Sequence, residues 1–487
     1  MKFNEAIRND SAYTYTENGQ LALNTTHSKC LDFFGVCGAL RNTDENRITR
    51  LFDDAYKEDK LLATKTLFYL RDVRGGLGER NTFRILLKYA AENYPECIVN
   101  NISLISDFGR FDDLYELVDT SLEETMWSIV SEQLVSDLDN MNNKKPVSLL
   151  AKWLKTADAS SKKTRALGIY TAQKLGYSVY EYKRIVKSLR KYIDVTEVKM
   201  SQNNWEDINY EAVPSKAMTK YRNAFIRHDG EGFMQYMDKV SSGEKKINAS
   251  TLFPYDIIEK FSYYNYNGLD ENEKKVLNAQ WDALPNYVEE GTNAIVMADT
   301  SGSMYGRPLN VAISLAIYFA QRNKGAYHNL WMSFSRNPKF HEIKGSKLEQ
   351  IMESIDMSDW TFNTDLNAAM EKILDVAVKN KVPADELPKS LIVVSDMEID
   401  SCSGKLFHDH LIQMYEAEGY VLPNIIFWNV NSRHDVFHAD SERMGVQLVS
   451  GCSPAIFAQV MNIVDMTPYE SMVYILSDER YNVITIA

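Results

Sequence analysis

The spacing of hydrophobic residues divides the chain into two regions. From about Cys30 to about Asp282, hydrophobic residues recur three and four positions apart, for example in DKLLATKTLFYLRDV (59–73) and NTFRILLKYAAENY (81–94). This periodicity predicts amphipathic helices rather than half-buried strands, which would alternate with a period of two. Glycines and prolines such as Gly75 interrupt the pattern at short intervals. A long series of helices joined by short breaks predicts helix pairs stacked as an α-solenoid.

The pattern changes near Gly291, where continuous apolar runs begin to alternate with helical stretches. The expected strands are AIVMA (294–298), NLWMSF (329–334), SLIVVSD (390–396), NIIFWNV (424–430) and GVQLVSG (445–451). The expected helices are PLNVAISLAIYFAQRN (308–323), LNAAMEKILDVAVKN (366–380), HDHLIQMYEAEG (408–419) and SPAIFAQVMNIV (453–464). Strands that are apolar on both faces and alternate with helices predict a doubly wound parallel sheet.

These patterns predict an α + α/β protein with three segments. Residues 1–30 are polar and rich in Asn and Thr, so we expect an N-terminal arm there. Residues 31–285 form the helical-repeat region, and residues 290–487 form the α/β region. A chain of 487 residues has room for such an arrangement, at roughly 100–200 residues per domain.

Composition points to an ordinary globular protein. Hydrophobic residues make up 45% and charged residues 25% of the chain, and the net charge is −13. The cysteines are few, odd in number and form no CxxC pair, so we expect reduced thiols and no zinc site. The N-terminus shows no signal-peptide core, and no apolar run of about 18 residues predicts a membrane span. We therefore expect a cytoplasmic protein with no membrane partner.

A set of oxygen-bearing side chains follows the expected strands at the ends where ligands bind in open α/β sheets. Asp299, Ser301 and Ser303 come directly after the first strand, and Asp396 ends a later one. Thr364 lies between them, just before a helix. Hydroxyl and carboxylate oxygens suit hard cations, so this set predicts a site for Mg²⁺, or for the compatible Mn²⁺.

The order of these groups resembles the metal-ion-dependent adhesion site of von Willebrand factor A domains: D-x-S-x-S, then a loop Thr, then an Asp after a later strand. By that resemblance, Ser301, Ser303 and Thr364 would bind the metal through their hydroxyls. Asp299 and Asp396 would mostly hold its waters, and a partner's carboxylate would fill the open position.

Three alternatives accompany this site. Ser301 and Ser303 would instead cap the helix at 307–322 if no metal is bound. Thr361 is the other candidate for the loop ligand. Glu398 and Asp400 would either add negative charge to the site or, as we expect, form a solvated loop.

Residues 144–199 form a basic segment in an acidic protein. They contain 14 Lys and Arg but only four Asp and Glu, so the segment carries +10 and the remaining chain −23. Such a segment is a candidate for phosphate binding. The residues expected to bind RNA are Lys152, Lys155, Lys162, Lys163, Arg165, Lys183, Arg184, Lys187, Arg190 and Lys191.

Aromatic residues interrupt this basic segment and could stack on bases. They are Trp153, Tyr170, Tyr177, Tyr180, Tyr182 and Tyr192. The spacing of Lys183, Lys187, Arg190 and Lys191 gathers them on one helix face. The alternative is a set of solvated helix faces whose cations pair with acids of the same protein.

The stretch RDVRGGLGER (71–80) combines glycines with arginines, a composition that can bind phosphate. It follows no buried strand, however, so it is not a nucleotide loop. We expect a turn between two helices whose arginines pair with acids such as Asp107, Asp112 or Asp113.

The helical region resembles an uncharacterised family related to the TROVE module of Ro ribonucleoproteins. The matching stretches are RDVRGGLGER (71–80), ISDFGRFDDLYEL (105–117), LLAKWLK (149–155), YKRIVKSLRKYIDVTEVKMSQNNWEDINYEAVPSKA (182–217) and AFIRHDGEGFMQYM (224–237). In Ro proteins a ring of HEAT-like helical repeats is closed by a von Willebrand A domain. Single-stranded RNA ends enter the ring, and small structured RNAs bind its basic outer surface. The resemblance thus implies an RNA partner.

Two functions follow from these observations. The first is a Ro-like RNA-binding protein whose metal site captures an acidic group of a protein partner. The second is a metal-dependent adaptor between proteins without RNA binding. We do not expect an enzyme, because His328, His341, His408 and His410 lie near no recognisable Ser or Cys nucleophile motif.

Overall fold

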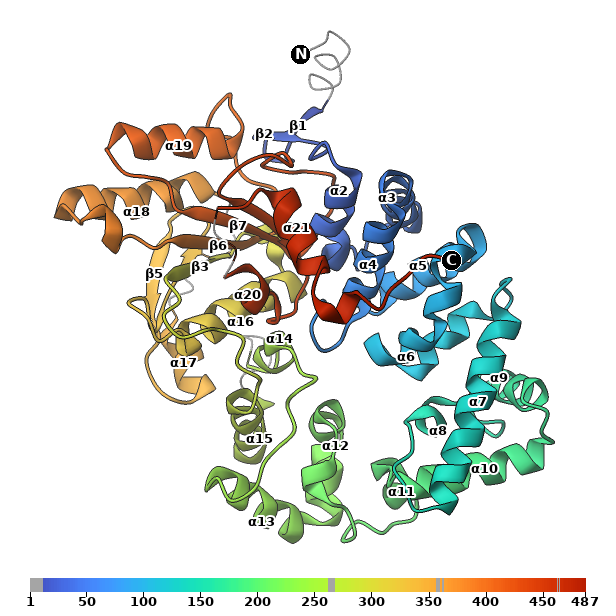
Figure 1. Cartoon of the computed structure of the whole chain (residues 1–487). Coiled ribbons are helices and arrows are strands. Elements are labelled where there is room, and N and C mark those ends of the chain that lie inside the picture. Colours follow the sequence, from blue (N-terminus) through green and yellow to red (C-terminus); the bar gives the residue numbers. More distant parts are fainter. Residues whose placement is uncertain (1–11, 262–267, 356–359, 361–362, 462, 464) are drawn as a thin grey trace.

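The computed structural model describes residues 12–261, 268–355, 360, 363–461, 463 and 465–487. Its N-terminal part is helical, and its C-terminal part contains a six-stranded, mostly parallel sheet (Figure 1). This division is the one that the hydrophobic pattern predicts. None of the helices in the described ranges has the length and apolar character needed to cross a membrane.

The sheet has the strand order β5-β4-β3-β6-β7-β8. Its strands are β3 (Ala294–Asp299), β4 (Leu330–Phe334), β5 (Lys339–Glu342), β6 (Ser390–Ser395), β7 (Asn424–Asn429) and β8 (Val446–Ser450). All neighbours are parallel except β4 and β5, so the predicted parallel sheet has one antiparallel edge. The strands from β6 to β8 and β3 are buried almost throughout, which explains their continuous apolar runs.

Helices cover both faces of this sheet. They are α16 (Arg307–Arg322), α17 (Leu348–Ser354), α18 (Leu366–Asn380), α19 (Phe407–Ala417), α20 (Ile456–Val460) and α21 (Pro468–Leu476). Helix α16 lies on one face, and α18 and α19 lie on the other (Figure 1). The chain runs from β3 through α16 to β4 in one direction and from β6 through α19 to β7 in the other. The direction therefore reverses between β3 and β6, where ligands bind in such sheets.

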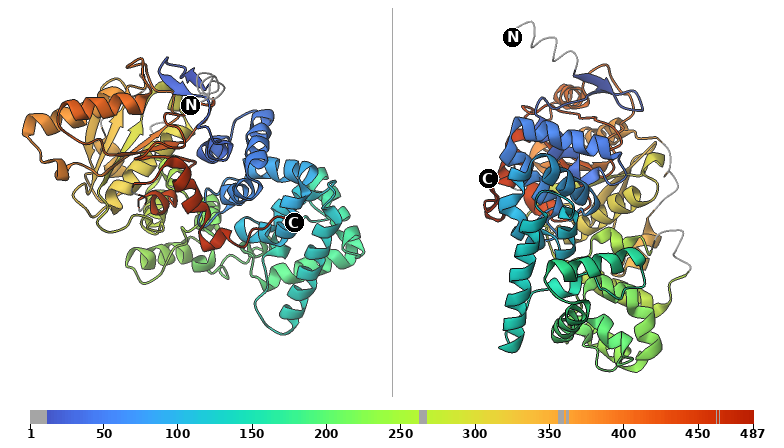
Figure 2. Two further views of the ribbon diagram at one scale, coloured as in Figure 1. Left: turned by 45° about the horizontal axis from the view of Figure 1, so that its top comes forward. Right: turned by 90° about the vertical axis from the view of Figure 1, so that its right-hand side faces the viewer.

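The helical region is an arch that contacts the α/β unit at both ends (Figures 1 and 2). Its α-helices are α2 (Lys29–Val36), α3 (Glu45–Glu58), α4 (Lys60–Arg71), α5 (Asn81–Asn93), α6 (Ile105–Phe108), α7 (Glu123–Asn142), α8 (Leu150–Trp153), α9 (Lys162–Lys174), α10 (Val179–Tyr192), α11 (Thr196–Ser201), α12 (Ser215–His228), α13 (Gly230–Ser241), α14 (Pro254–Ile258) and α15 (Glu271–Asp282). Helix α2 packs on β8, and α14 packs on α16. In the left view of Figure 2, α7 to α10 lie at the end of the molecule opposite the sheet.

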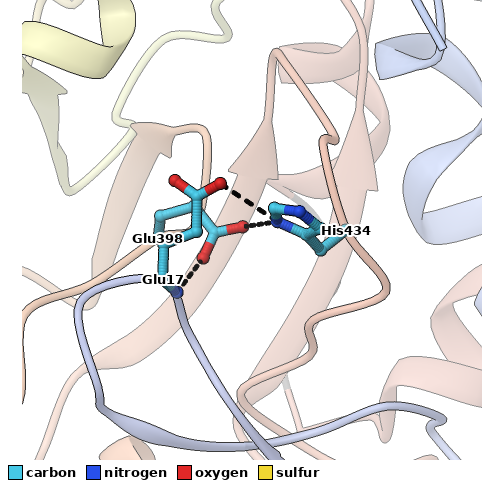
Figure 3. A group of neighbouring side chains, drawn as sticks. All are labelled: Glu17, Glu398 and His434. Atoms are coloured by element: carbon cyan, nitrogen blue, oxygen red, sulfur yellow. Dashed lines mark hydrogen bonds and ion pairs between the residues drawn. The ribbon is translucent and has the colours of Figure 1, made fainter.

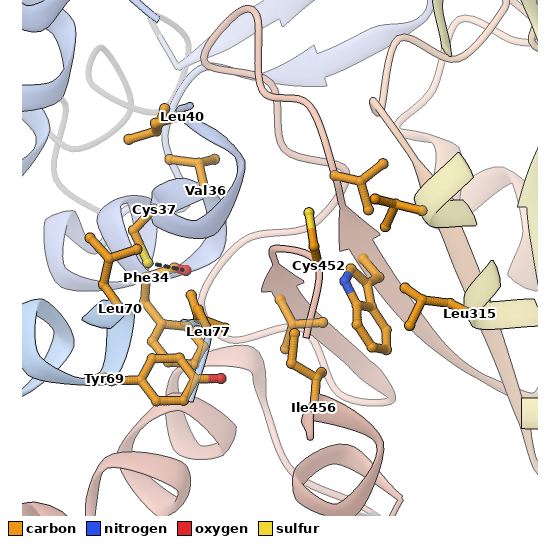
Figure 4. Packing of buried hydrophobic residues seen from close by; sticks show 14 of the residues in the cluster. Phe34, Val36, Cys37, Leu40, Tyr69, Leu70, Leu77, Leu315, Cys452 and Ile456 are labelled. Atoms are coloured by element: carbon orange, nitrogen blue, oxygen red, sulfur yellow. Dashed lines mark hydrogen bonds between the residues drawn. The ribbon is translucent and has the colours of Figure 1, made fainter. Parts of the chain in front are cut away.

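One hydrophobic core runs across the junction of the two regions (Figure 4). Phe34 and Tyr69 from the helices belong to the same cluster as Leu315 and Ile456 from the α/β unit. The backbones approach closely here, because a Cβ atom on Gly38 would lie 2.7 Å from the carbonyl oxygen of Ser450. A second, smaller core lies within the arch around α12 and α13.

Each end of the chain contacts the region formed by the opposite part of the sequence. The N-terminal arm contains two short strands, β1 (Tyr13–Tyr15) and β2 (Leu21–Leu23), and Leu23 forms a β-bridge to Phe437 of the α/β unit. The sequence predicts only a polar arm there, because three-residue strands carry too little periodicity. At the other end, Arg480 forms an ion pair with Asp72 at 2.5 Å. The N-terminal arm thus contacts the α/β unit, and the C-terminal segment contacts the helical region.

Candidate metal centre and basic helix face

The candidate metal ligands lie at the point where the sheet reverses direction. Asp299 ends β3, and Asp396 directly follows β6. The two strands are paired in parallel, with Ala298 opposite Val394, so the two carboxylates leave neighbouring strands at the same edge. Both are buried. The sheet register therefore brings together two residues that lie almost 100 positions apart in the sequence.

The D-x-S-x-S loop is ordered by its own hydrogen bonds. The Ser301 amide donates to Asp299 Oδ1 at 2.8 Å, and the Ser395 hydroxyl donates to Asp299 Oδ2 at 2.5 Å. The hydroxyl oxygens of Ser301 and Ser303 are 3.2 Å apart. Ser301 is buried and Ser303 is exposed, so of the two serines Ser303 is the one that solvent reaches. Neither serine caps α16, whose N-cap is Gly306, and the capping alternative is wrong.

Thr364 reaches this edge of the sheet on a separate loop. Its amide donates to Asp400 Oδ1 at 3.2 Å, and its carbonyl accepts from the Asp400 amide at 3.0 Å. The loop is thereby fixed to the segment that follows Asp396. The Thr364 side chain is buried. Thr361, the other candidate, lies outside the described residues.

The electrostatics of the crevice suit a cation. Burial, and next the negative charge of Asp396, raise the pKa of Asp299 from its ordinary value to about 7. Two buried carboxylates repel each other, and a divalent ion between them would remove that repulsion. The surrounding groups are hydroxyl and carboxylate oxygens, the ligands that Mg²⁺ and Mn²⁺ prefer. The residues therefore fit a hard divalent cation.

Two further charged residues lie at the crevice: Arg433, which the sequence does not point to, and Glu398, which it offers as a possible source of negative charge. Arg433, in the loop after β7, lies with Nη2 3.0 Å from Asp396 Oδ2. Glu398 is buried and hydrogen-bonded, so the expectation that it belongs to a solvated loop is wrong. Nothing in the sequence near Arg433 points to the crevice, because the contact depends on how the loop folds back.

The basic segment 144–199 covers α8, α9, α10 and the first part of α11, with their connecting loops. The cations predicted to bind RNA divide into two groups. Lys162, Lys163, Arg165, Arg184, Lys187 and Lys191 are exposed and form no ion pair within the part of the chain that the structure describes. The others are engaged: Lys183 pairs with Asp158 at 2.9 Å, and Lys152 and Lys155 lie over the rings of Trp153 and Tyr115.

Arg190 does not belong to the predicted cationic face. Its guanidinium donates to the carbonyl oxygens of Ala151 and Leu154, each at 2.8 Å. These are carbonyls at the end of α8, which need donors because a helix end leaves them unpaired. Arg190 is therefore a structural link between α8 and α10. Spacing alone placed it with Lys187, since helical periodicity does not show which side meets a neighbour.

The exposed face of α10 instead carries Tyr180, Arg184, Lys187 and Lys191. These residues are spaced four, three and four apart, so they form one row along the helix. Tyr180 is 71% exposed, and the Arg184 guanidinium lies 5.8 Å from its ring centre. Tyr182, also predicted to stack on bases, is fully buried. Tyr180 is thus the aromatic residue of this row that is accessible for stacking on a base.

Two family models match the chain. The model described as Domain of unknown function (DUF2828) matches residues 16–149 and 168–292, which together make up more than half of the sequence. The chain belongs to the DUF2828 family. A second model, Domain of unknown function (DUF7788), matches residues 293–480. The α10 row lies within the DUF2828 match, whereas Lys152 and Lys155 lie in the gap between its two matched segments.

Comparisons with individual proteins also find likenesses to this DUF2828 protein. It is 26% identical over 510 residues to uncharacterized protein L728 of Acanthamoeba polyphaga mimivirus, covering 95% of this chain and 87% of that protein. A crystal structure of the Ro (RSR) protein of Deinococcus radiodurans matches 94% of this chain and 100% of its own, with 12% identity and a TM-score of 0.38. The TROVE and von Willebrand A assignments remain predictions.

The glycine-arginine stretch of the DUF2828 region is a turn between α4 and α5, as expected. Arg71 pairs with the buried Asp113 at 2.8 Å, and Arg74 donates to the Asp107 carbonyl at 2.7 Å. A Cβ atom on Gly76 would lie 2.2 Å from the Tyr69 carbonyl oxygen, so the turn requires glycine there. These arginines stabilise the fold and are not grouped around an open site.

Proposed function

We propose that this DUF2828 protein binds single-stranded RNA along the exposed face of α10. The observation that carries the proposal is the row of Arg184, Lys187 and Lys191, three exposed cations without an ion pair among the described residues. In a chain with a net charge of −13, such a row is a local positive site that attracts an anionic partner. A polyanionic backbone that follows the helix fits this description.

Two features support RNA as the polyanion. Tyr180 offers an exposed ring at the start of the row, and aromatic rings stack on unpaired bases without strong sequence preference. The resemblance of the helical region to Ro ribonucleoproteins also implies RNA. Small structured RNAs would present the same phosphates together with unpaired ends.

The N-terminus of α9 extends this surface. Lys162 and Lys163 occupy its first positions, and Arg165 follows one turn into the helix. Cations are normally disfavoured at a helix N-terminus, because the helix dipole is positive there. A phosphate would be attracted by both the exposed amides and these side chains. This placement supports an anionic ligand rather than an ordinary solvated helix start.

Titration of labelled single-stranded RNA at several salt concentrations tests the proposal. Each lost phosphate contact should flatten the dependence of log affinity on log salt by about 0.7. The variant Arg184→Gln/Lys187→Gln/Lys191→Gln should therefore bind more weakly, with a slope shallower by about 2.

Lys183→Gln is the matched control, because Lys183 already pairs with Asp158 and should leave the slope unchanged. Arg190 is left intact because it holds α8. If wild-type protein fails to bind RNA at low salt, or if the triple variant keeps the wild-type slope, this face is not an RNA site.

We further propose a second activity for the same chain: metal-dependent capture of an acidic protein partner at a von Willebrand A-type crevice. The supporting observation is the pair of buried carboxylates, Asp299 and Asp396, at the reversal point of the sheet. Ser301, Ser303 and Thr364 would supply hydroxyl ligands to Mg²⁺ or Mn²⁺. The bound ion would supply a positive charge that attracts a partner's Asp or Glu side chain.

This second activity can be separated from the first by affinity capture with and without a chelator. Protein partners that bind through the crevice should be retained with Mg²⁺ and released by chelation, whereas RNA should remain bound. Partners retained equally under both conditions would not be held by a metal. If capture of the partner requires metal but RNA binding is absent, the protein is an adaptor only.

A further inference from the structure

Three potential metal ligands meet beside the crevice, outside the set already described (Figure 3). They are Glu17, Glu398 and His434, and their ligand atoms all lie within 4.8 Å of one another. Glu17 comes from the loop between β1 and β2, Glu398 from the segment after β6, and His434 from the loop after β7. Their convergence is therefore a product of the tertiary fold and not of sequence proximity.

We propose that Glu17, Glu398 and His434 bind a divalent transition-metal ion of the zinc class. Zn²⁺ bonds to histidine nitrogen at about 2.0–2.1 Å and to carboxylate oxygen at about 2.0–2.2 Å. Two such ligands on one tetrahedral ion are about 3.3 Å apart. His434 Nδ1 lies 2.9 Å from Glu398 Oε1 and 3.4 Å from Glu17 Oε1. The two distances from His434 therefore lie on either side of the value expected for ligands of one ion.

Burial and charge favour a cation at this position. The Glu398 side chain is only 2% exposed, and its Oε1 lies 2.9 Å from His434 Nδ1. The guanidinium of Arg433 is shared between Glu17, at 2.6 Å, and Asp396, at 3.0 Å. Arg433 therefore compensates the two glutamates only in part, since Asp396 shares it and Glu398 pairs with no Lys or Arg among the described residues. A divalent ion would supply the missing positive charge.

The surrounding hydrogen bonds hold the ligands in place. The Glu17 amide donates to Glu398 Oε2 at 2.7 Å, which leaves Oε1 of Glu398 directed at His434. The Thr16 hydroxyl donates to the Ile399 carbonyl at 2.7 Å, and the Asn18 amide group donates to the Glu398 carbonyl at 2.7 Å. Ligands fixed by such contacts lose little freedom when an ion binds. His434 remains 53% exposed, so an ion can enter from solvent.

This site uses ligands that the cysteine count does not reveal. The expectation of no zinc site rests on the absence of CxxC pairs, whereas here the donors are one imidazole and two carboxylates. Three protein ligands leave a fourth position open for water or for another ligand, as in zinc sites that are not purely structural. The bound ion would fasten the β1–β2 loop to the mouth of the Asp299 crevice. This inference does not depend on the proposed RNA site, and the Asp299→Ala control below separates it from the proposed magnesium site.

Zn²⁺ titration of the full-length protein in millimolar Mg²⁺ tests the inference. Mg²⁺ occupies oxygen sites such as the crevice, so calorimetry should report one Zn²⁺ per chain. His434→Ala and Glu17→Gln should each weaken Zn²⁺ binding at least about tenfold, because each removes a ligand. X-ray absorption of the zinc-loaded protein should show a nitrogen and oxygen shell at about 2.0 Å, with an imidazole contribution that His434→Ala removes.

Two control variants locate the ion. His410→Ala removes a partly exposed imidazole of the same unit, hydrogen-bonded to Asn367, and should leave Zn²⁺ binding unchanged. Asp299→Ala disrupts the crevice and should also leave it unchanged. Loss of Zn²⁺ in Asp299→Ala but not in His434→Ala would place the ion in the crevice and overturn the inference. Absence of Zn²⁺ binding in the wild type, or unchanged binding in both ligand variants, would also overturn the inference. Glu17, Glu398 and His434 would then be hydrogen-bonded residues without a metal.

Discussion

The Asp299 crevice and the α10 face present their charges in opposite ways. In the crevice, the carboxylates of Asp299 and Asp396 are buried between strands that the sheet fixes in register. On α10, Arg184, Lys187 and Lys191 extend into solvent from a single helix. The crevice is preorganised for a small ion, whereas the helix offers flexible cations that can follow a long, variable ligand. Affinity should depend on individual atoms in the first case and on summed charge in the second.

The largest expected effect is the loss of Mg²⁺ binding in Asp299→Ala. Removing one of two central carboxylates should lower the affinity below detection by calorimetry, at least about a thousandfold or 4 kcal/mol. RNA affinity should be unchanged, because α10 is at the far end of the molecule (Figure 2). A parallel loss of RNA binding in this variant would show that the two surfaces are coupled and would break the contrast between them.

The second expected effect is a loss of folding stability at acid pH, which concerns the α/β unit and not the α10 face. Burial, with a smaller contribution from Arg443, lowers the pKa of His408 in α19 from its ordinary value to about 4. His408 of the unfolded chain then binds a proton near pH 6.5, whereas His408 of the folded chain binds it only near pH 4. Stability present above pH 6.5 is therefore lost as the pH falls towards 4. The loss attributable to His408 is on the order of 3 kcal/mol. The cations of α10 keep their charge over this range.

Urea unfolding at several pH values measures this effect. His408→Gln should lose less stability than the wild type between pH 6.5 and 4, while groups common to both proteins cancel in the comparison. Parallel stability curves for the two proteins would mean that burial does not lower the pKa of His408. RNA titrations between pH 7 and 6 should show no corresponding change.

The smallest expected effect concerns the aromatic end of the α10 row. Tyr180→Ala should weaken RNA binding by about 1 kcal/mol, roughly fivefold, through the loss of one stacked base. The salt dependence should not change, because no charge is removed. Tyr474→Ala is a matched control, since Tyr474 is 55% exposed on α21. A flatter salt slope in Tyr180→Ala would mean that the ring acts by positioning Arg184 instead.

The sequence predicts those elements that the local pattern of hydrophobic residues determines. The buried strands and long amphipathic helices of the α/β unit follow from hydrophobic periodicity, and Asp299 and Asp396 are found because each ends such a strand. The edge strand β5, Lys339–Glu342, is missed because it is short and half exposed. Among the described residues of the predicted helix at 453–464, α20, Ile456–Val460, is the helical part.

Features that depend on distant contacts could not be predicted. Arg433 and Glu17 reach the crevice only because a loop and the N-terminal hairpin fold over it. Arg190 has the spacing of an exposed cation, but its side chain caps the carbonyls of α8. Periodicity gives the direction of a side chain relative to its own helix. It does not give the neighbour that the side chain will meet.

The β-bridge between Leu23 and Phe437 constrains how the protein is made. These residues lie 414 positions apart, and the ribosome adds roughly 5–20 residues per second, so the N-terminal strands wait roughly 20–80 s for their partner. Helix α2 packs on α3 and α4, which follow it directly, but the side that meets β8 waits as long for its partner. The nascent chain therefore carries exposed hydrophobic surface through most of its synthesis, a condition that favours aggregation.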